Sequence, residues 1–242
     1  MEIENSRLYI RIYPKKVVIL QKSVNNMETI QELKELFTIN NDINIEEQFR
    51  NIAHKLFFEY AIFTSEYGCF LFKEIEFYYY CSKHKDIITH PRNSEPLLWY
   101  INDFGGIDIN FASHIQQVEK FPTSKYILDD SAYFGGVLIR QLISTDKKKL
   151  LGSPLKVAEL YRKFDASEYD SHYPIIKPFS SEGELLNPEN RINLVKKDDA
   201  DLISQKVRNI LFNYDKEKSK IPEDLNFAFQ KFIYSKYRYI RN

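Results

Sequence analysis

Hydrophobic and polar positions in the first half of the chain repeat with two different periods. Between Glu46 and Phe57 the large apolar side chains recur at the spacing of a helix with one buried face: Phe49, Ile52, Ala53 and Leu56. The following stretches, Phe58–Ser65 and Cys69–Tyr80, are rich in β-branched and aromatic residues and flank the turn residues Glu66–Gly68. The pattern predicts a helix followed by a β-hairpin.

The second half of the chain predicts further strands and a final helix. Tyr133–Ile143 is short, apolar and β-branched, which is typical of a buried strand. Trp99–Ala112 also favours a strand, but Gly105 and Gly106 in its middle predict a bend or bulge. A helical pattern returns from Glu223 to about Tyr234. Helices and antiparallel hairpins without regular strand–helix–strand alternation predict an α+β fold.

The two ends of the chain differ in pattern from its centre. Near the N-terminus, Leu8–Ile12 and Val17–Leu20 predict short strands and Thr29–Phe37 predicts a helix, before the polar breaker Asn40–Asn44. The C-terminal residues are rich in Lys, Arg and Tyr. We expect an N-terminal extension or small subdomain over 1–44, an α+β domain over 45–212, and a basic, Tyr-rich helix and tail over 213–242.

Composition and charge narrow the classes of function. The 242 residues are 43% hydrophobic, which is enough for a real core. Two cysteines, Cys69 and Cys81, exclude a disulfide framework and a thiolate-rich zinc module. Lys and Arg number 34 and Asp and Glu number 34, which argues against coating nucleic acid or membrane by bulk charge. With no secretory leader and no apolar run of about 20 residues, we expect a cytoplasmic protein without a membrane span.

Two carboxylates lie on one face of the long predicted strand. Because side chains alternate along a strand, Phe72, Glu74, Glu76 and Tyr78 share a face, and Leu71, Ile75 and Phe77 share the other. The two carboxylates have Cα atoms about 6.6 Å apart, so partial burial would raise their pKa values unless a cation intervenes. The alternative is a strand with one solvated polar face.

Arg140 gives that strand face a candidate cation. It lies within Gly136–Ile143, a segment that reads as buried on both faces. A buried guanidinium is costly unless a carboxylate and further acceptors satisfy it, and Glu74 or Glu76 would suit. The alternatives are an arginine that reaches solvent at a strand edge and an ordinary core salt bridge.

The polar stretch Ser82–Pro96, expected to be a loop, carries His84, Asp86, His90 and Arg92. The first three could be read as metal ligands of a metal-dependent hydrolase. Their spacing matches no strong metal signature, and loop histidines commonly lie at the surface. We therefore expect no metal, and keep the hydrolase as an alternative.

Several short motifs occur in the order found in one family of DNA repair enzymes. They are Glu74-Ile-Glu76-Phe-Tyr78, Asp86-x-x-x-His90, Gly105 to Asn110, Val137-Leu-Ile-Arg140, Gly152-Ser-Pro154-Leu-Lys156, Arg191-Ile-Asn-Leu194 and Val207-Arg208-Asn-Ile-Leu. Together with the helix around Asn51–Leu56, this series resembles the alkyladenine (3-methyladenine) DNA glycosylase family over about residues 45–212. That family has a Glu-Thr-Glu-Ala-Tyr strand, an Asp-x-x-x-His loop, a Tyr-rich strand ending in Asn, and a Val-Leu-Leu-Arg strand.

The resemblance implies a fold and a mechanism. The fold would be a single α+β domain with a mainly antiparallel curved sheet and peripheral helices. Glu76 would activate water, Arg140 would help to hold that water, and His90 would lie beside a base flipped out of DNA. Tyr78 would stack on the base and Asn110 would stand at the pocket wall. The family needs no metal or cofactor, and no lysine occupies the matched positions, so we expect hydrolysis without lyase activity.

The Tyr-rich strand of the family is replaced here by Leu98–Gly105. Trp99, Tyr100 and Phe104 are the candidates to replace its stacking and wedging tyrosines. We count them with Glu74, Tyr78 and Asn110 as expected substrate-binding residues. Asp103 and Asp108 add negative charge where a phosphate backbone would pass, which counts against standard duplex binding.

These observations leave more than one function open. The first hypothesis is a monofunctional glycosylase acting on a damaged or modified base in DNA, which could be single-stranded. The second is a catalytically inactive nucleic-acid-binding protein of the same fold. Residues 1–44 could bind a protein partner. The basic, Tyr-rich C-terminal segment suits phosphate contact and base stacking, or it is a solvated tail with a few tyrosines packed on the core.

Overall fold

The computed structural model describes residues 30–102, 104–119, 125–127, 129–161, 173–192, 227 and 231–242. It divides the chain into two compact units, Met1–Leu36 and Phe37–Asn242. In the first unit residues 30–36 are helical, which confirms the helix expected there. The strands expected before residue 29 lie outside the described residues. The division falls at Leu36, ahead of the boundary expected after residue 44.

The helix and hairpin expected near the start of the second unit are both present. Helix α2 spans Ile45–Phe58, strand β1 spans Tyr60–Thr64 and strand β2 spans Gly68–Cys81. The side chain of Asn44 caps α2 by accepting hydrogen bonds from the backbone N–H groups of Glu46 and Glu47. These two glutamates also stabilise the positive end of the helix dipole. The hydrophobic period therefore predicted this part of the fold correctly.

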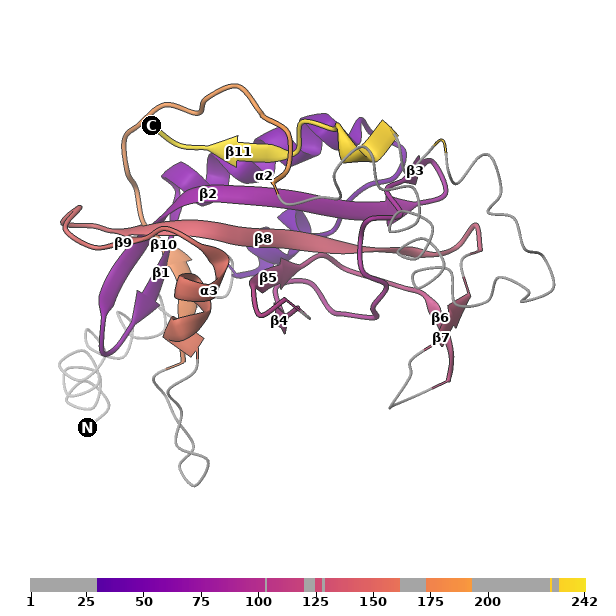
Figure 1. Ribbon diagram of the computed structural model, residues 1–242, viewed down its shortest axis with the longest axis horizontal. Helices are drawn as coiled ribbons and strands as arrows, with labels where there is room; N and C mark the ends of the chain where they lie inside the picture. Colours follow the sequence, from indigo (N-terminus) through magenta and orange to yellow (C-terminus); the bar gives the residue numbers. More distant parts are fainter. Residues whose placement is uncertain are drawn as a thin grey trace, which may run out of the picture. The chain divides into compact units, whose positions relative to one another are not determined.

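Strand β2 is the centre of an antiparallel sheet (Figure 1). The long strand β8 (Tyr133–Ser144) pairs with β2 on one side, and β1, β11 (Arg238–Ile240) and β3 (His84–Lys85) pair with it in turn on the other. Beyond these lie β5 (Ile107–Asn110) and β4 (Trp99–Ile101) at one edge, and β10 (Ile175–Pro178) at the other. The short strand β9 (Leu150–Leu151) pairs with β8, and β6 (Gln116–Glu119) pairs with β7 (Lys125–Ile127) in a separate ribbon.

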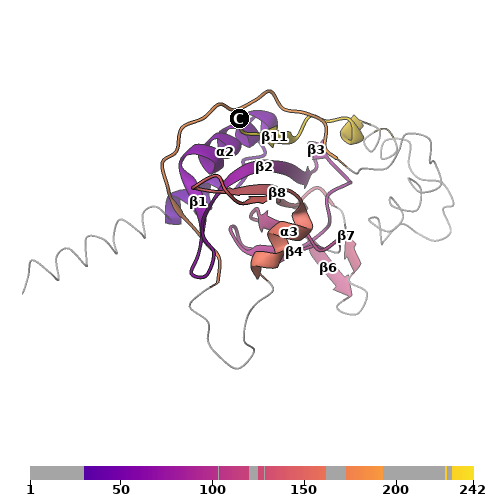
Figure 2. The same cartoon turned by 60° about the vertical axis from the view of Figure 1, so that its left-hand side comes forward.

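The apolar face of β2 packs against α2. The ring of Phe49 from the helix stacks on Phe77 at 4.5 Å between centroids, and both lie near Phe111. In Figures 1 and 2, α2 lies on one side of the β2–β8 pair, and α3 (Pro154–Ala158) lies on the other. The 3-10 helix η1 (Glu159–Tyr161) follows α3 directly. This packing buries Ile75, Phe77 and Tyr79, so the alternate side chains of β2 point to the opposite face.

The last residues of the chain belong to the sheet rather than to a separate tail. Strand β11 pairs with β2 at the positions of Glu74–Glu76. Tyr237 and Tyr239 are buried, and the Arg241 guanidinium donates to the carbonyl oxygens of Phe57 and Glu182. The described part of 213–242 thus packs two tyrosines on the core, while Tyr234 is exposed, and two of its arginines point inward. Of the helix expected over 223–234, residues 227 and 231–233 are helical, and most of the rest lies outside the described residues.

The unit Phe37–Asn242 confirms the expected α+β class, with an antiparallel, curled sheet and peripheral helices. Gly105 and Gly106 lie in the turn that joins β4 to β5, where Gly105 has a φ of 76°, so the expected bend is a hairpin turn. Within the described part of the chain, no helix combines the length and apolarity that a membrane crossing needs.

We expect Gly135→Ala to lower the free energy of unfolding by about 3 kcal/mol, because the new methyl group would collide with the backbone of β2. A Cβ at this position would overlap the carbonyl oxygen of Tyr78 and lie 2.9 Å from the Cα of Tyr79. Gly152→Ala is the matched control, since its Cβ would meet nothing closer than 3.8 Å. Urea unfolding of both variants tests this, and equal stabilities would contradict it.

Candidate functional site

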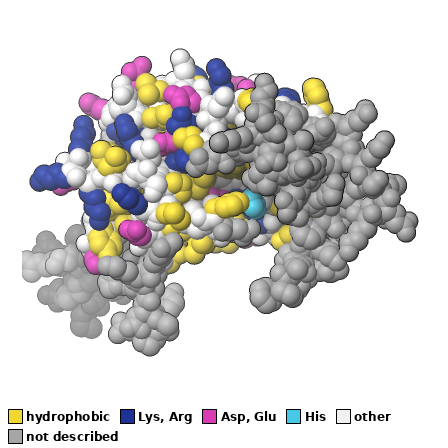
Figure 3. Space-filling view, in the orientation of Figure 1, with side chains coloured by type: hydrophobic (Ala, Val, Ile, Leu, Met, Phe, Trp, Pro, Cys, Tyr) yellow, Lys and Arg dark blue, Asp and Glu magenta, His cyan; other side chains and the backbone are white. Residues whose placement is uncertain are grey.

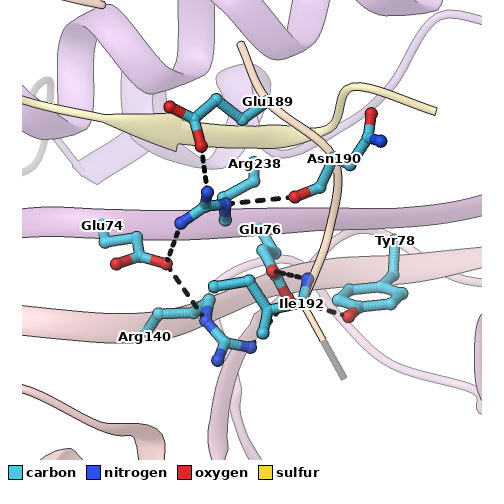
Figure 4. Close-up of polar contacts among 8 residues, drawn as sticks. All are labelled: Glu74, Glu76, Tyr78, Arg140, Glu189, Asn190, Ile192 and Arg238. Atoms are coloured by element: carbon cyan, nitrogen blue, oxygen red, sulfur yellow. Dashed lines mark hydrogen bonds and ion pairs between the residues drawn. The ribbon is translucent and has the colours of Figure 1, made fainter. Parts of the chain in front are cut away.

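Arg140 bridges the two carboxylates of β2. Its Nε lies 3.2 Å from Oε1 of Glu74, and its Nη1 lies 3.1 Å from Oε2 of Glu76 (Figure 4). The register of β2 and β8 shifts between Phe72 and Ile75, and Arg140 has no register partner there. The ion pairs predicted from a buried arginine and alternating glutamates are therefore present, on the face of β2 opposite α2.

Glu76 is fully buried and every contact it makes favours its charged form. Its Oε2 also accepts a hydrogen bond of 2.9 Å from the Tyr78 hydroxyl, and its Oε1 accepts one of 2.7 Å from the backbone N–H of Ile192. Burial raises the pKa of Glu76 above its usual value of 4.5, against the lowering by the Arg140 charge and by these hydrogen bonds. A buried carboxylate with a raised pKa is a stronger base than one in water.

Pairing across three strands brings further polar side chains to the same face. Leu138 of β8 lies opposite both Glu76 and Asp108, and Gly136 lies opposite both Tyr78 and Asn110. Residues in such cross-strand rows point to the same side of the sheet. The expected residues Glu76, Tyr78 and Asn110 therefore share one face, and Asp108 shares it with them.

Arg92 lies over Gly136 on this face. A Cβ on Gly136 would come within 2.5 Å of Arg92 Nη2, so only glycine leaves room for the guanidinium. Arg92 Nη2 forms a buried ion pair of 3.2 Å with Asp108 Oδ2, and the guanidinium stacks on the Tyr100 ring at 4.3 Å. Burial raises the pKa of Asp108, and the Arg92 charge partly offsets this. Asp108 is thus neutralised internally, rather than exposed where a phosphate backbone would pass.

His90 and Phe104 lie beside Arg92, Tyr100 and Asp108, and we call these five residues the Asp108 cluster. The ring of Phe104, 70% exposed, lies edge-on to half-buried His90 with centroids 6.0 Å apart, and the His90 charge acts on Asp108. His90 therefore lies beside Asp108. In the view of Figure 3 a histidine side chain lies beside hydrophobic side chains at the surface.

Trp99 lies in a different place from the other expected substrate-binding residues. Trp99 lies opposite Ile109, which lies opposite Val137. Because Ile109 is next to Asp108 along β5, the side chain of Trp99 is on the other face of the sheet from that of Asp108. Its indole N–H donates to the carbonyl oxygen of Pro174, and its ring meets that of Tyr161. Its contacts serve the packing of the sheet edge, and they do not include Glu76 or Arg140. The expectation that Trp99 lines the same pocket receives no support from this geometry.

The side chains of the metal-ligand alternative are engaged elsewhere. Asp86 forms a fully buried, two-pronged ion pair with Arg191, at 2.7 and 3.2 Å. His84 is buried rather than at the surface, and its ring nitrogens lie 2.8 Å from the carbonyl oxygen of Tyr79 and 3.0 Å from the Tyr237 hydroxyl. Burial lowers the pKa of His84, which suits a neutral structural imidazole. Among the described residues no group of His, Cys, Asp and Glu forms that could hold a metal ion.

Arg191 also contacts the expected stacking residue. Its guanidinium lies 4.7 Å from the centre of the Tyr78 ring, and it donates to the carbonyl oxygens of Phe77 and Phe232. One face of Tyr78 is therefore occupied by Arg191. A base stacking on Tyr78 would use its other face or its edge.

The arrangement can support acid–base chemistry at a buried carboxylate. Glu76 offers a base, Arg140 offers a cation that orients it, and the Asp108 cluster offers hydrogen-bonding groups on the same face. Sequence reasoning missed Arg92 and the role of Asp108. Asp108 stands two residues before Asn110, and strand alternation could have placed both on one face. Comparisons with protein-family models, with curated proteins and with solved structures gave no match.

Proposed function

We propose that the protein is a monofunctional DNA glycosylase that hydrolyses the N-glycosidic bond of a damaged or modified base flipped out of DNA. Glu76 acts as the base that activates water and as the negative charge opposite the developing positive charge of the sugar. Arg140 holds Glu76 in place. The observation that carries the proposal is the contact of Arg140 with Glu76 on a buried strand face, at 3.1 Å.

The surroundings of Glu76 support this role. Hydrogen bonds from Tyr78 and Ile192 orient the carboxylate, and its burial excludes bulk water that would weaken electrostatic stabilisation. The order of the motifs, which resembles that of the alkyladenine DNA glycosylase family, supports the same assignment. The Asp108 cluster contains His90 and Phe104, and Asn110 follows Asp108 on the same face of β5. A flipped base would be recognised there by stacking and hydrogen bonds.

Exposed positive charge for binding DNA is found away from the buried arginines. Figure 3 shows basic side chains gathered at the end of the sheet that carries the β8–β9 turn, where Lys147, Lys148 and Lys149 are exposed. Lysines of this kind suit sequence-independent contacts with phosphates. Binding would then weaken as salt concentration rises.

A panel of oligonucleotides tests the proposal. Single-stranded and duplex DNA, each with one modified base, is incubated with the full chain and treated with alkali, which breaks the strand at abasic sites. Breaks at the modified base of at least one substrate are expected, and no breaks without alkali, because lyase activity is not. A panel with no alkali-sensitive site at enzyme excess would contradict the proposal.

The catalytically inactive, nucleic-acid-binding alternative rests on one observation, that Glu76 is 0% exposed and both its oxygens already accept hydrogen bonds. A water molecule must then enter between Glu76 and its partners for hydrolysis. Salt-sensitive DNA binding that is unchanged in Glu76→Gln, without turnover by the wild-type protein, would favour this alternative.

We expect the excision rate to fall on the acid side with a midpoint above 4.5, because Glu76 must be ionised and burial raises its pKa. The free energy of unfolding should change with pH in the opposite direction to the excision rate, because a raised pKa of Glu76 means that the folded state favours the protonated carboxyl group. This contribution to stability is complete below the unfolded pKa and is lost as pH rises through the folded pKa. Single-turnover rates over a pH series measure the midpoint, and a rate without an acid limb would contradict the role of Glu76.

A further inference from the structure

Glu74 lies between two arginines from different strands. Its Oε1 lies 3.2 Å from Nε of Arg140 on β8 and 3.1 Å from Nη1 of Arg238 on β11 (Figure 4). The same carboxylate oxygen therefore receives both guanidinium groups. A carboxylate engaged in this way is poorly suited to bind substrate, which is the role expected for Glu74 from the sequence.

Arg238 is itself held on all sides. Its Nη2 forms an ion pair with Glu189, its Nε donates to the carbonyl oxygen of Asn190 at 3.1 Å, and its backbone pairs with β2 opposite Glu76. The guanidinium position is therefore fixed by the pairing of the C-terminal strand with the centre of the sheet. A charge held by its backbone in this way can act on its neighbours without the entropy cost of an exposed ion pair.

Arg140 contacts two carboxylates, and Arg238 brings a second positive charge to this group, which it shares between Glu74 and Glu189. Glu74 and Glu76 are buried carboxylates, and Arg140 alone would have to neutralise both. Arg238 supplies the second positive charge and contacts Glu74, not Glu76, in the described geometry. Because the Arg238 charge also neutralises Glu74, Nη1 of Arg140 can form its ion pair with Glu76.

We propose that Arg238 is a positioning residue that acts through Glu74 to keep Arg140 on Glu76. The inference rests on the proposed function, because it assigns a role in setting the ionisation of the carboxylate that activates water. Glu76 also meets the Tyr78 hydroxyl, the N–H of Ile192 and the charge of Arg191. The ion pair of Arg92 with Asp108 lies across β8 on the same face of the sheet. Arg238→Gln loses the side-chain contacts with Glu189 and Asn190, but the backbone hydrogen bonds between residues 238 and 189 still hold the segment that carries Arg191 and Ile192.

The test follows the titration of Glu76 itself, by NMR of protein with carbon-13-labelled glutamate carboxyl groups. The Glu76 signal is assigned by its loss in Glu76→Gln. In Arg238→Gln the Glu76 carboxyl group should titrate at higher pH than in the wild type, because Arg140 is then shared more equally between Glu74 and Glu76. Arg238→Lys keeps the positive charge, so its Glu76 carboxyl group should titrate close to the wild-type pH.

A double variant distinguishes an effect of the Arg238 charge, passed on through Glu74, from an effect of lost packing. Glu74→Gln/Arg238→Gln removes both outer charges, so Arg140 serves Glu76 alone, and the titration should return to or below the wild-type position. Arg241→Gln is the matched control, since the Arg241 guanidinium also anchors the C-terminal segment but does so by donating to the carbonyl oxygens of Phe57 and Glu182. It should leave the Glu76 titration unchanged.

An unchanged titration in folded Arg238→Gln would overturn the inference, as would a double variant that stays at the position of the single one. If Arg238→Gln does not fold, Glu74→Gln is compared with the double variant. Equal Glu76 titrations are expected, because Arg238 acts through Glu74, and a Glu76 titration at higher pH in the double variant would overturn the inference. In an enzyme assay, the acid limb of Arg238→Gln should move to higher pH, so that its rate on the limb is several-fold below wild type. A wild-type protein without glycosylase activity would contradict the proposed function, while the NMR titration would still measure the effect of Arg238 on Glu76.

Discussion

Glu76→Gln is expected to slow base excision by about 10²- to 10⁴-fold, which is the usual contribution of a positioned general base. Glutamine has the shape of glutamate, and its one amide oxygen can accept from Tyr78 and Arg140 in place of Oε2, while its NH2 group replaces the oxygen that accepts from Ile192. It has no negative charge and cannot take a proton from water. Arg140 keeps its contact with Glu74, so the substitution leaves no arginine unpaired. The measurement is the single-turnover rate on the best substrate of the panel.

The control for this variant is Glu66→Gln, a change of the same chemistry at an exposed position in the β1–β2 turn. It should excise at the wild-type rate. Both proteins should unfold at about the wild-type temperature, since burial already favours an uncharged side chain at position 76. A Glu76→Gln protein that excises as fast as Glu66→Gln would remove Glu76 from the mechanism.

Arg191→Met is expected to lower the free energy of unfolding by about 3–5 kcal/mol, because it leaves Asp86 charged, buried and without its cation. Both side chains are 0% exposed, and Arg191 makes two contacts with Asp86 and two with backbone carbonyl oxygens. Such a loss is a large part of the total stability of a typical domain. Urea unfolding followed by circular dichroism measures it.

A double variant and a surface control complete this test. Asp86→Leu/Arg191→Met replaces the whole pair by apolar groups and should recover most of the loss, since a buried pair gains little net energy over good packing. Lys83→Met breaks the exposed ion pair with Asp42, 2.7 Å long, and should leave the free energy of unfolding close to that of the wild type, because water screens this pair. Similar losses for Arg191→Met and Lys83→Met would contradict the buried-pair account.

The parts of the fold and site that sequence predicted are those with local patterns. The helical period of Ile45–Phe58 and the alternation along β2 depend only on neighbouring residues, so the helix, the hairpin and the shared face of Glu74 and Glu76 could be read directly. The partner of Arg140 followed from the cost of a buried guanidinium. These arguments needed no knowledge of which strands pair.

The parts that were missed depend on pairing over long distances in the chain. Strand β11 has three residues and no pattern of its own, and its partner Glu74 lies 164 positions before Arg238. The hydrogen bond from Ile192 to Glu76 uses a backbone group, which no side-chain pattern can indicate. Arg92 depends on the space above Gly136, which is created only when β5 and β8 pair.

The polar stretch after β2 was misread for a related reason. A run rich in charged residues commonly lies in solvent, but His84, Asp86 and Arg92 are all buried because each finds a partner from a distant segment. Asp86 meets Arg191, His84 meets Tyr237, and Arg92 meets Asp108. Polar composition alone cannot distinguish a solvated loop from a buried network of this kind.

The most direct test of the central claim, that Glu76 and Arg140 form the hydrolytic site of a glycosylase, is to identify the released product. Modified-base DNA is incubated with wild-type protein or with Glu76→Gln, and small molecules are analysed by mass spectrometry. We expect free base from the wild type, in an amount equal to the abasic sites formed, and at least about 10²-fold less from Glu76→Gln at equal times. No free base from any substrate with wild-type protein in excess, or equal release by both proteins, would contradict it.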